Sequence, residues 1–257
     1  MKKILSAVFA GLMLASIGAS VQAASDAKHP KDLSWGFEGF TGTYDRGALQ
    51  RGFQVYKEVC SACHGVKYIA FRNLMEIGFS EEEAKAIAAQ YIVAGDLDEY
   101  GEPTERDGKL FDYIPSPQPN DIAARAANNG ALPPDLSLMV KARANGADYV
   151  YSLLTGYEDG HEVAPGMSYN PYFAGGEIAM GQPLFDDQVL YADGTEASLE
   201  QMSKDVVVFL TWAAEPTLEE RKKIGFKVMS FLLVLTILLY FSNKKVWAGL
   251  KGRKKED

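Results

Sequence analysis

The pentapeptide Cys60-Ser61-Ala62-Cys63-His64 constrains this chain more than any other stretch of its sequence. Two thiols three positions apart, followed at once by a histidine, form the pattern required for covalent haem attachment. Each thiol can add to one haem vinyl group, and the short tether then places the imidazole of His64 over the iron as the proximal ligand. The pattern therefore predicts one covalent haem c, held by Cys60, Cys63 and His64.

A redox dithiol and half of a zinc site are the alternatives for the same residues. Structural zinc normally takes four protein ligands, and the chain has only two cysteines and three histidines. A dithiol does not require a histidine after the second cysteine. Because both cysteines belong to the motif, none is left for a disulfide, and a covalent haem would give the fold a large apolar support.

Residues 1–24 have the pattern of a secretory signal peptide. Lys2 and Lys3 give a charged start, the stretch 4–17 is apolar and small, and Val21-Gln22-Ala23 precedes the expected cleavage point. An uncleaved anchor helix is the alternative. Because c-type haem is attached outside the cytoplasm in bacteria, export agrees with the haem motif, and the short charged start is typical of a bacterial signal.

The stretch 224–243 is uncharged except for Lys227 and has about the length needed to span hydrocarbon. Lys227 lies near one end, where its ammonium group can snorkel. The stronger basic flank follows the stretch, which predicts a cytoplasmic C-terminus; a buried core helix is the alternative. The expected organisation is a signal peptide (1–24), a periplasmic haem domain (25–220), a transmembrane helix (221–243) and a basic cytoplasmic tail (244–257).

Between these segments the sequence predicts short helices joined by long loops. The helices are expected from caps and apolar periodicity at 46–60, 80–91, 120–128, 135–143, 147–154 and 198–214. Residues 95–119 lack periodicity and carry many carboxylates, which predicts an acidic surface loop.

The charge is unevenly distributed along the chain. Residues 24–220 carry 14 basic and 32 acidic side chains, a net charge of −18, whereas residues 221–257 have a net charge of +8. An acidic body argues against nucleic acid as a partner and favours a cationic protein.

The second axial ligand is not determined by spacing. A methionine thioether would raise the potential and close the iron, which suits electron transfer, whereas an open site would suit a peroxidase-type enzyme. His29 lies near the processed end and His161 in an acidic turn, so both are weaker candidates than the methionines of the later loop. Met167 and Met180 both qualify.

Longer motifs make the sequence specific. CSACHG at 60–65, ARAANNGALPPDLS at 124–137, DYVYSLLTGY at 148–157 and MSYNPYFAGGEIAMGQPL at 167–184, followed by the tail anchor, resemble the cytochrome c1 family. The resemblance covers nearly all of the chain after the signal segment. It implies a mainly α fold, a cytochrome c-type haem domain with long loop insertions plus one C-terminal transmembrane helix, in which the helices at 46–60 and 198–214 cross.

The resemblance also implies roles for particular residues. In this family the methionine of the Ile-Ala-Met triplet is the distal ligand, which selects Met180 over Met167. The family's haem pocket implies Asn128, Pro133, Pro134 and Arg143, with Arg143 and Tyr149 facing the propionates. A guanidinium can pair with a buried carboxylate and so hold the charge of the haem in place.

The function that the resemblance implies is electron transfer within a respiratory or photosynthetic quinol–cytochrome c oxidoreductase complex. The chain would take one electron from the Rieske iron–sulfur protein and pass it to a soluble cytochrome c, beside a cytochrome b subunit, in a dimeric complex of the bacterial inner membrane. Enzyme activity would belong to the complex. An independent membrane-anchored electron shuttle and a haem peroxidase are the alternatives.

Overall fold

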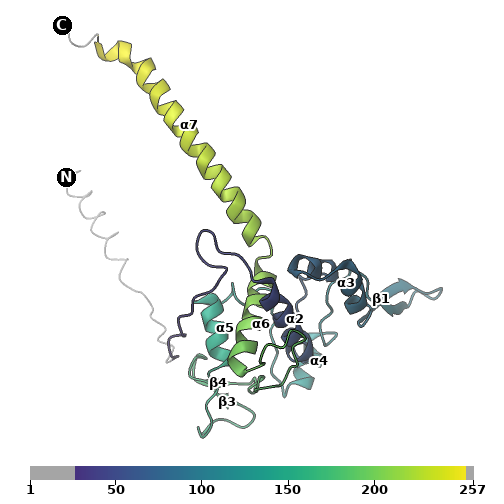
Figure 1. Ribbon diagram of the computed structural model, residues 1–257. Helices are drawn as coiled ribbons and strands as arrows, with labels where there is room; N and C mark the ends of the chain where they lie inside the picture. Colours follow the sequence, from purple (N-terminus) through teal and green to yellow (C-terminus); the bar gives the residue numbers. More distant parts are fainter. Residues whose placement is uncertain (1–26, 253–257) are drawn as a thin grey trace, which may run out of the picture.

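A computed structural model describes residues 27–252; the expected signal peptide (1–24) and residues 253–257 lie outside the described residues. The described body is mainly helical, with two small antiparallel sheets, and a long helix leaves it at one end (Figure 1). The mainly α fold with one long apolar C-terminal helix confirms the prediction. The elements are α2 (Arg46–Glu58), η2 (Cys60–Ala62), η3 (Phe71–Ile77), α3 (Glu81–Ala88), β1 (Ile92–Leu97), β2 (Pro103–Asp107), α4 (Asp121–Ala127), α5 (Gly146–Leu154), β3 (Ser168–Tyr169), β4 (Glu177–Ile178), α6 (Leu199–Ala214) and α7 (Leu218–Gly252).

Helices α2 and α6 form the centre of the body. The Asp45 carboxylate caps α2 by accepting from the backbone amides of Gly47 and Ala48, as the sequence predicts. The two helices approach very closely at Gly52, where an added Cβ would lie 2.0 Å from the carbonyl oxygen of Asp205. Only glycine permits this approach, so Gly52 sets the point at which the helices cross.

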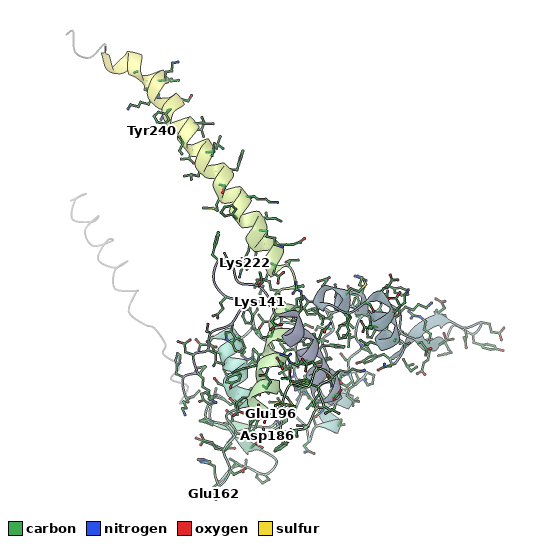
Figure 2. The ribbon with its side chains drawn as sticks, in the orientation of Figure 1. Lys141, Glu162, Asp186, Glu196, Lys222 and Tyr240 are labelled. Carbon is green, nitrogen blue, oxygen red and sulfur yellow. The ribbon has the colours of Figure 1, made fainter. Side chains whose placement is uncertain are left out.

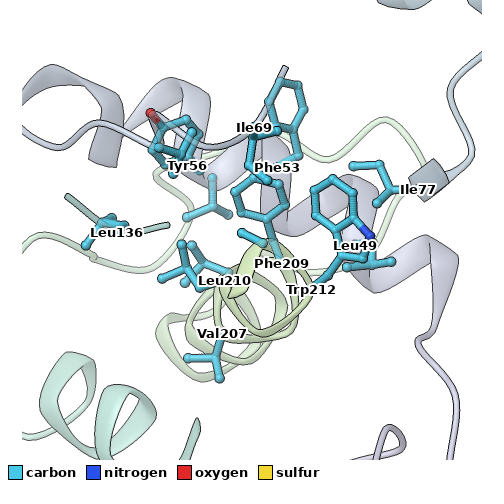
Figure 3. Close-up of a cluster of buried hydrophobic side chains, with 14 of the residues drawn as sticks. Leu49, Phe53, Tyr56, Ile69, Ile77, Leu136, Val207, Phe209, Leu210 and Trp212 are labelled. Carbon is cyan, nitrogen blue, oxygen red and sulfur yellow. The ribbon is translucent and has the colours of Figure 1, made fainter. Parts of the chain in front are cut away.

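Aromatic side chains fill the space around that crossing (Figure 3). The Phe53 ring of α2 lies 5.6 Å from the Phe209 ring of α6, and Tyr56 lies at the same distance from Phe209. All three side chains and Trp212 are buried. Burying rings of this size is a main source of the stability of the body, and it fixes the end of α2, from which the cysteine motif continues.

A buried ion pair joins the same two helices. Arg51 donates two hydrogen bonds to the carboxylate of Asp205, at 2.8 and 3.0 Å, and a third to Asp193 at 2.8 Å. Asp205 is fully buried, and Gln201 donates to it as well. A buried carboxylate needs partners of this kind because its desolvation is costly.

Helix α5 holds the chain segments on either side of it. The amide of Lys31 donates to Ser152 Oγ at 2.8 Å, which ties the chain before α2 across this helix. The side chain of Asn170 is buried and donates to the carbonyl of Leu153 at 2.8 Å. Asn170 directly follows β3, so this bond fixes the β3–β4 hairpin against the end of α5.

Two predicted segments differ in the structure. The expected loop 95–119 begins with an antiparallel hairpin of β1 and β2, in which Ile92 pairs with Asp107 and Leu97 with Pro103, and this hairpin projects from the body (Figure 1). Strand β2 is polar, and β1 is apolar over residues 92–95 without alternation in its sequence, so no period-two pattern identifies the pair. Residues 136–145 form turns rather than the expected helix, although the Asp135 carboxylate accepts from the Ser137 amide as well as from Lys67.

Helix α7 continues from α6 after a turn of three residues, 215–217. Glu215 in this turn pairs with Arg221 of α7 and with Lys141 of the body, at 3.1 Å from the latter. The Tyr44 hydroxyl donates to the carbonyl of Glu215 at 3.1 Å. The joint between the body and α7 (Figure 2, near Lys141 and Lys222) is therefore held from several sides.

Candidate haem site

The cysteine motif begins where α2 ends. The carbonyl of Cys60 accepts from the amides of Cys63 at 3.1 Å and His64 at 2.9 Å, which closes a tight turn around the motif. Cys60 is half-buried and packs against the core, whereas Cys63 is exposed. Burial raises the pKa of the Cys60 thiol to about 12. A raised thiol pKa disfavours the thiolate at Cys60.

The orientation of His64 is fixed by one hydrogen bond. Its Nδ1 lies 2.7 Å from the carbonyl oxygen of Pro134. A carbonyl can only accept, so Nδ1 carries the proton. Burial lowers the pKa of His64 and so favours the neutral ring. In a neutral imidazole protonated at Nδ1, Nε2 keeps its lone pair. Nε2 is therefore available to a metal, and a backbone carbonyl on the opposite nitrogen is the usual second-shell partner of a metal-binding histidine.

Two further bonds hold the segment after the motif against residues 135 and 136, and one holds His64 to α2. The amide of Leu136 donates to the carbonyl of Gly65 at 2.8 Å, and the amide of Lys67 donates to Asp135 at 3.0 Å. The hydroxyl of Tyr56 donates to the carbonyl of His64 at 3.1 Å. Asp135 and Tyr56 were not among the predicted site residues. Asp135 acts across 68 residues of sequence, and no local periodicity could have indicated this contact.

The two methionine candidates lie at the same end of the β3–β4 hairpin. Ser168 pairs with Ile178; Met167 lies directly before β3 and Met180 two residues after β4. Both side chains are half-buried. They differ in their backbone contacts, because the carbonyl of Met180 accepts a 2.9 Å hydrogen bond from the hydroxyl of Tyr157. Tyr157 was not predicted as a site residue either.

The remaining predicted residues lie on the segments that carry these groups. Asn128 ends α4, and its side chain donates to the carbonyl of Ala124 at 2.7 Å. Pro133 directly precedes the proline that bonds to His64. Tyr149 is half-buried on α5, packed against the core. Arg143 is exposed in the turns before α5, and its guanidinium donates to the carbonyl of Ala142.

The two other histidines make contacts elsewhere. His29 is exposed, with Nδ1 2.9 Å from the carbonyl of its neighbour Pro30. His161 is exposed and stacks on the ring of Tyr169 at a centroid distance of 3.7 Å. It lies 3.4 Å from the Glu158 carboxylate. Neither contact leads to the cysteine motif.

The donor set of the motif fits haem c. Two thiols lie on one turn, and the histidine that follows them carries its proton on Nδ1, leaving the nitrogen that binds iron. When bound, haem supplies a one-electron couple whose potential depends on the axial ligands and on hydrogen bonding around them. The chain's own part is to hold those ligands and to exclude water from them.

The fold and the site together define a c-type cytochrome whose domain is followed by a membrane-type helix. In comparisons with known proteins, the "Cytochrome C1 family" matches residues 35–250. The chain belongs to the cytochrome c1 family, and it binds one covalent haem c through the CxxCH motif.

Several relatives are similar over most of the chain. "Cytochrome c1, heme protein, mitochondrial" of Saccharomyces cerevisiae is 49% identical, over 91% of this chain and 77% of its own length. "Cytochrome b-c1 complex catalytic subunit, mitochondrial" of Candida albicans is 49% identical, over 91% of this chain and 83% of its own. "Cytochrome b/c1" of Bradyrhizobium diazoefficiens is 45% identical, over 94% of this chain and 39% of its own.

Proposed function

We propose that this chain is the electron-transfer subunit of a quinol–cytochrome c oxidoreductase complex. It takes one electron from a Rieske iron–sulfur protein and passes it to a soluble c-type cytochrome, with cytochrome b as its membrane partner in a dimeric complex. Family membership supports this, as do the relatives whose names assign them to the b-c1 complex. No bond of a substrate is made or broken by the chain, so catalysis belongs to the whole complex.

The 2.7 Å contact between His64 Nδ1 and the Pro134 carbonyl carries the proposal, because it presents Nε2 as an iron ligand. Met180 is proposed as the distal ligand, supported by the family motif and by the bond from Tyr157 to its carbonyl. Two axial ligands close the iron to exogenous molecules, which suits electron transfer rather than peroxidase chemistry. Asn128 and Pro133 would line the pocket.

Arg143 and Tyr149 are proposed to hold the haem propionates. Arg143 lies before α5 and is exposed. Tyr149 lies in the first turn of α5 and is half-buried. A guanidinium next to a propionate would form charge-assisted hydrogen bonds that fix the haem and offset its negative charge. In this proposal the Arg143 side chain turns from the Ala142 carbonyl to the haem.

The proposed location is the bacterial inner membrane, with residues 25–220 in the periplasm and residues 244–257 in the cytoplasm. Helix α7 contains a candidate span of 31 residues, Leu218–Ala248, in which an 18-residue window has a mean hydropathy of 2.2 and is not buried in the body. That is enough to cross a bilayer. The pattern of residues 1–24 and the basic residues after 243 support the direction of insertion.

Purification in mild detergent, with subunit identification and a haem spectrum, tests the proposal. We expect cytochrome b and a Rieske protein in stoichiometric amounts, and a low-spin spectrum. A chain that purifies alone with the same spectrum would be an independent shuttle. A high-spin iron that binds cyanide rapidly would indicate a peroxidase-type site instead.

Haem staining after denaturing electrophoresis tests the attachment itself. The chain should give a stained band that survives acid–acetone extraction, because thioether bonds are stable to acid. Cys60→Ser combined with Cys63→Ser should abolish the stain while His29→Gln, which alters an exposed histidine away from the motif, should not. Loss of the haem from the unaltered chain on extraction would exclude covalent attachment.

A further inference from the structure

One loop of the body leaves an aromatic side chain in solvent while burying the aromatic side chains around it. Residues 36–43, here called the Phe40 loop, are closed by a hydrogen bond from the Thr43 amide to the Gly36 carbonyl at 3.0 Å. Trp35 and Tyr44 flank the loop and Phe37 lies within it; these three side chains are only 5–7% exposed. Phe40, in the middle of the loop, is 68% exposed. The loop therefore points one ring away from the core.

The same loop is fastened to the base of α7. The ammonium group of Lys222 donates to the carbonyls of Phe37 at 2.7 Å and Gly42 at 2.9 Å, one on each side of Phe40. Next to the loop, the Tyr44 amide donates to Glu219 of α7 at 2.9 Å. Figure 1 shows the chain before α2 rising on the side of the body from which α7 leaves, and Figure 2 marks Lys222 at that joint.

Phe40 also contacts the apolar part of α7 directly. Its ring lies 6.3 Å from the ring of Phe226, with the two planes at 69°. Ile224 and Phe226 are 57% and 60% exposed, and they begin the stretch 224–243. Twenty helical residues span about 30 Å, the thickness of the hydrocarbon core. Phe226 therefore lies at the outer edge of that span, and Phe40 is held at the same depth.

A single exposed aromatic residue on a soluble surface needs no explanation. Phe40 differs because its position relative to a membrane-type helix is fixed by hydrogen bonds on both sides of it. Apolar side chains such as Phe, Trp and Leu on membrane-surface segments are buried at the boundary between lipid headgroups and acyl chains. Lys223, exposed on the adjacent turn of α7, adds a cationic group where lipid phosphates lie.

We propose that the Phe40 loop is a second membrane contact of this chain, in which the Phe40 ring enters the outer headgroup–acyl boundary of the phospholipid bilayer beside α7. The body is then held at two points rather than one, which sets its tilt as well as its distance from the membrane. This inference depends on α7 crossing the bilayer and not on the identity of the electron partners.

Depth-dependent quenching by brominated lipid tests the proposal in the full complex. Phe40→Cys places one free thiol on the loop, since haem occupies Cys60 and Cys63, and this thiol is labelled with the fluorophore NBD. The complex is reconstituted in phosphatidylcholine vesicles with or without bromine on the acyl chains near the headgroup. We expect NBD at position 40 to lose most of its emission in brominated vesicles, nearly as much as NBD at Phe226→Cys.

Two variants sharpen the result. Glu162→Cys carries the label on an exposed loop at the end of the body opposite α7 (Figure 2) and should show no quenching. Phe40→Cys combined with Lys222→Met removes the two bonds that fasten the loop, so its quenching should fall well below that of the single variant. Unchanged haem absorption checks that each variant is folded.

The proposal is wrong if label at position 40 is quenched no more than label at position 162. Blue-shifted NBD emission that brominated lipid does not quench would show that a neighbouring subunit, rather than lipid, covers Phe40. Equal quenching with and without Lys222 would show that its bonds to the Phe37 and Gly42 carbonyls do not set the depth of the loop. That result would also overturn the proposal.

Discussion

The backbone of Met180, the proposed distal ligand, is held by the Tyr157 hydroxyl, which donates to its carbonyl at 2.9 Å. Met167 and Met180 both extend from the same end of the β3–β4 hairpin. Met180→Leu should abolish the weak far-red absorption of methionine-ligated ferric haem. It should also lower the potential by on the order of a tenth of a volt or more, within the roughly 0.8 V that axial ligation spans.

Met167→Leu is the matched control for that substitution. It alters a half-buried thioether of the same hairpin, and the far-red absorption and the potential should stay as they are. If Met167→Leu removes the absorption and Met180→Leu leaves it intact, the distal ligand is Met167.

Tyr157→Phe should weaken the attachment of Met180 without removing it. A hydrogen bond of this kind contributes about 1 kcal/mol net, roughly a fivefold change in an equilibrium. Loss of the far-red absorption on raising the pH should therefore occur at lower pH, since an unfastened methionine is displaced more easily. Tyr169→Phe, which keeps the ring stacked on His161, is the control. Identical pH profiles for all three proteins would show that Tyr157 does not position the ligand.

At this scale the sequence predicts the residues that carry the chemistry and misses those that orient them. Cys60, Cys63 and His64 follow from a local motif whose spacing is the requirement of the chemistry itself. The partners of that motif cannot be found this way. The contacts of Tyr56 with the His64 carbonyl and of Asp135 with the Lys67 amide depend on how two turns meet in space.

Among the elements, the crossing of α2 and α6 depends most on one residue. Gly52→Ala would place a Cβ 2.0 Å from the Asp205 carbonyl, which is backbone and cannot rotate away. The helices must separate, and overpacking of this kind costs about 1–3 kcal/mol. Thermal unfolding of the complex, followed by haem absorption, should show a clear loss of stability.

Gly47→Ala, in the same helix, is the control for Gly52→Ala. Its nearest neighbours would be side-chain atoms at 3.3 and 3.4 Å, on Asp45 and Arg51. Alanine is the better helix former by roughly 0.5–1 kcal/mol, so stability should be kept or raised. Equal losses at positions 47 and 52 would mean that glycine at the crossing is not needed for the close approach.

The elements found from sequence are those with caps and apolar periodicity. Asp45, Ser80 and Ser198 cap α2, α3 and α6 as predicted. The β1–β2 hairpin was not predicted from the sequence. Its residues are mostly exposed, so burial imposes no alternation of apolar and polar residues on them. The helix expected after Asp135 is absent from the described structure, where residues 136–145 form turns, although the carboxylate accepts from the Ser137 amide at the expected capping position.

For the whole molecule, α7 should be the attachment to the membrane. A stop codon before Lys222 should release haem-containing protein into the soluble periplasmic fraction, because the span of α7 is then lost. Fractionation with haem staining measures this. Truncated protein that remains in washed membranes lacking the partner subunits would show that another attachment suffices.

The acidic body should steer a basic soluble cytochrome c. The net charge of −18 over residues 24–220 acts over a Debye length of roughly 8–10 Å at ordinary salt. It should raise the association rate by roughly tenfold or more while adding little to bound-state stability. The second-order rate of electron transfer should therefore fall as salt rises.

Neutralising the carboxylates between 96 and 107 tests whether the projecting hairpin contributes to this steering. A flatter salt dependence of the electron-transfer rate would show that the hairpin contributes to electrostatic steering. An unchanged salt dependence would show that it does not. If the unaltered chain itself shows no salt dependence, docking is apolar.

The joint between the body and α7 bears on which components must move during electron transfer. Glu215 bonds to residues of both parts, Tyr44 bonds to the turn, and Lys222 reaches back to the body. These contacts oppose a swing of the domain about α7. The distance from the haem to the membrane is then fixed by the joint. The electron donor and acceptor proteins, rather than this domain, must therefore move to make contact.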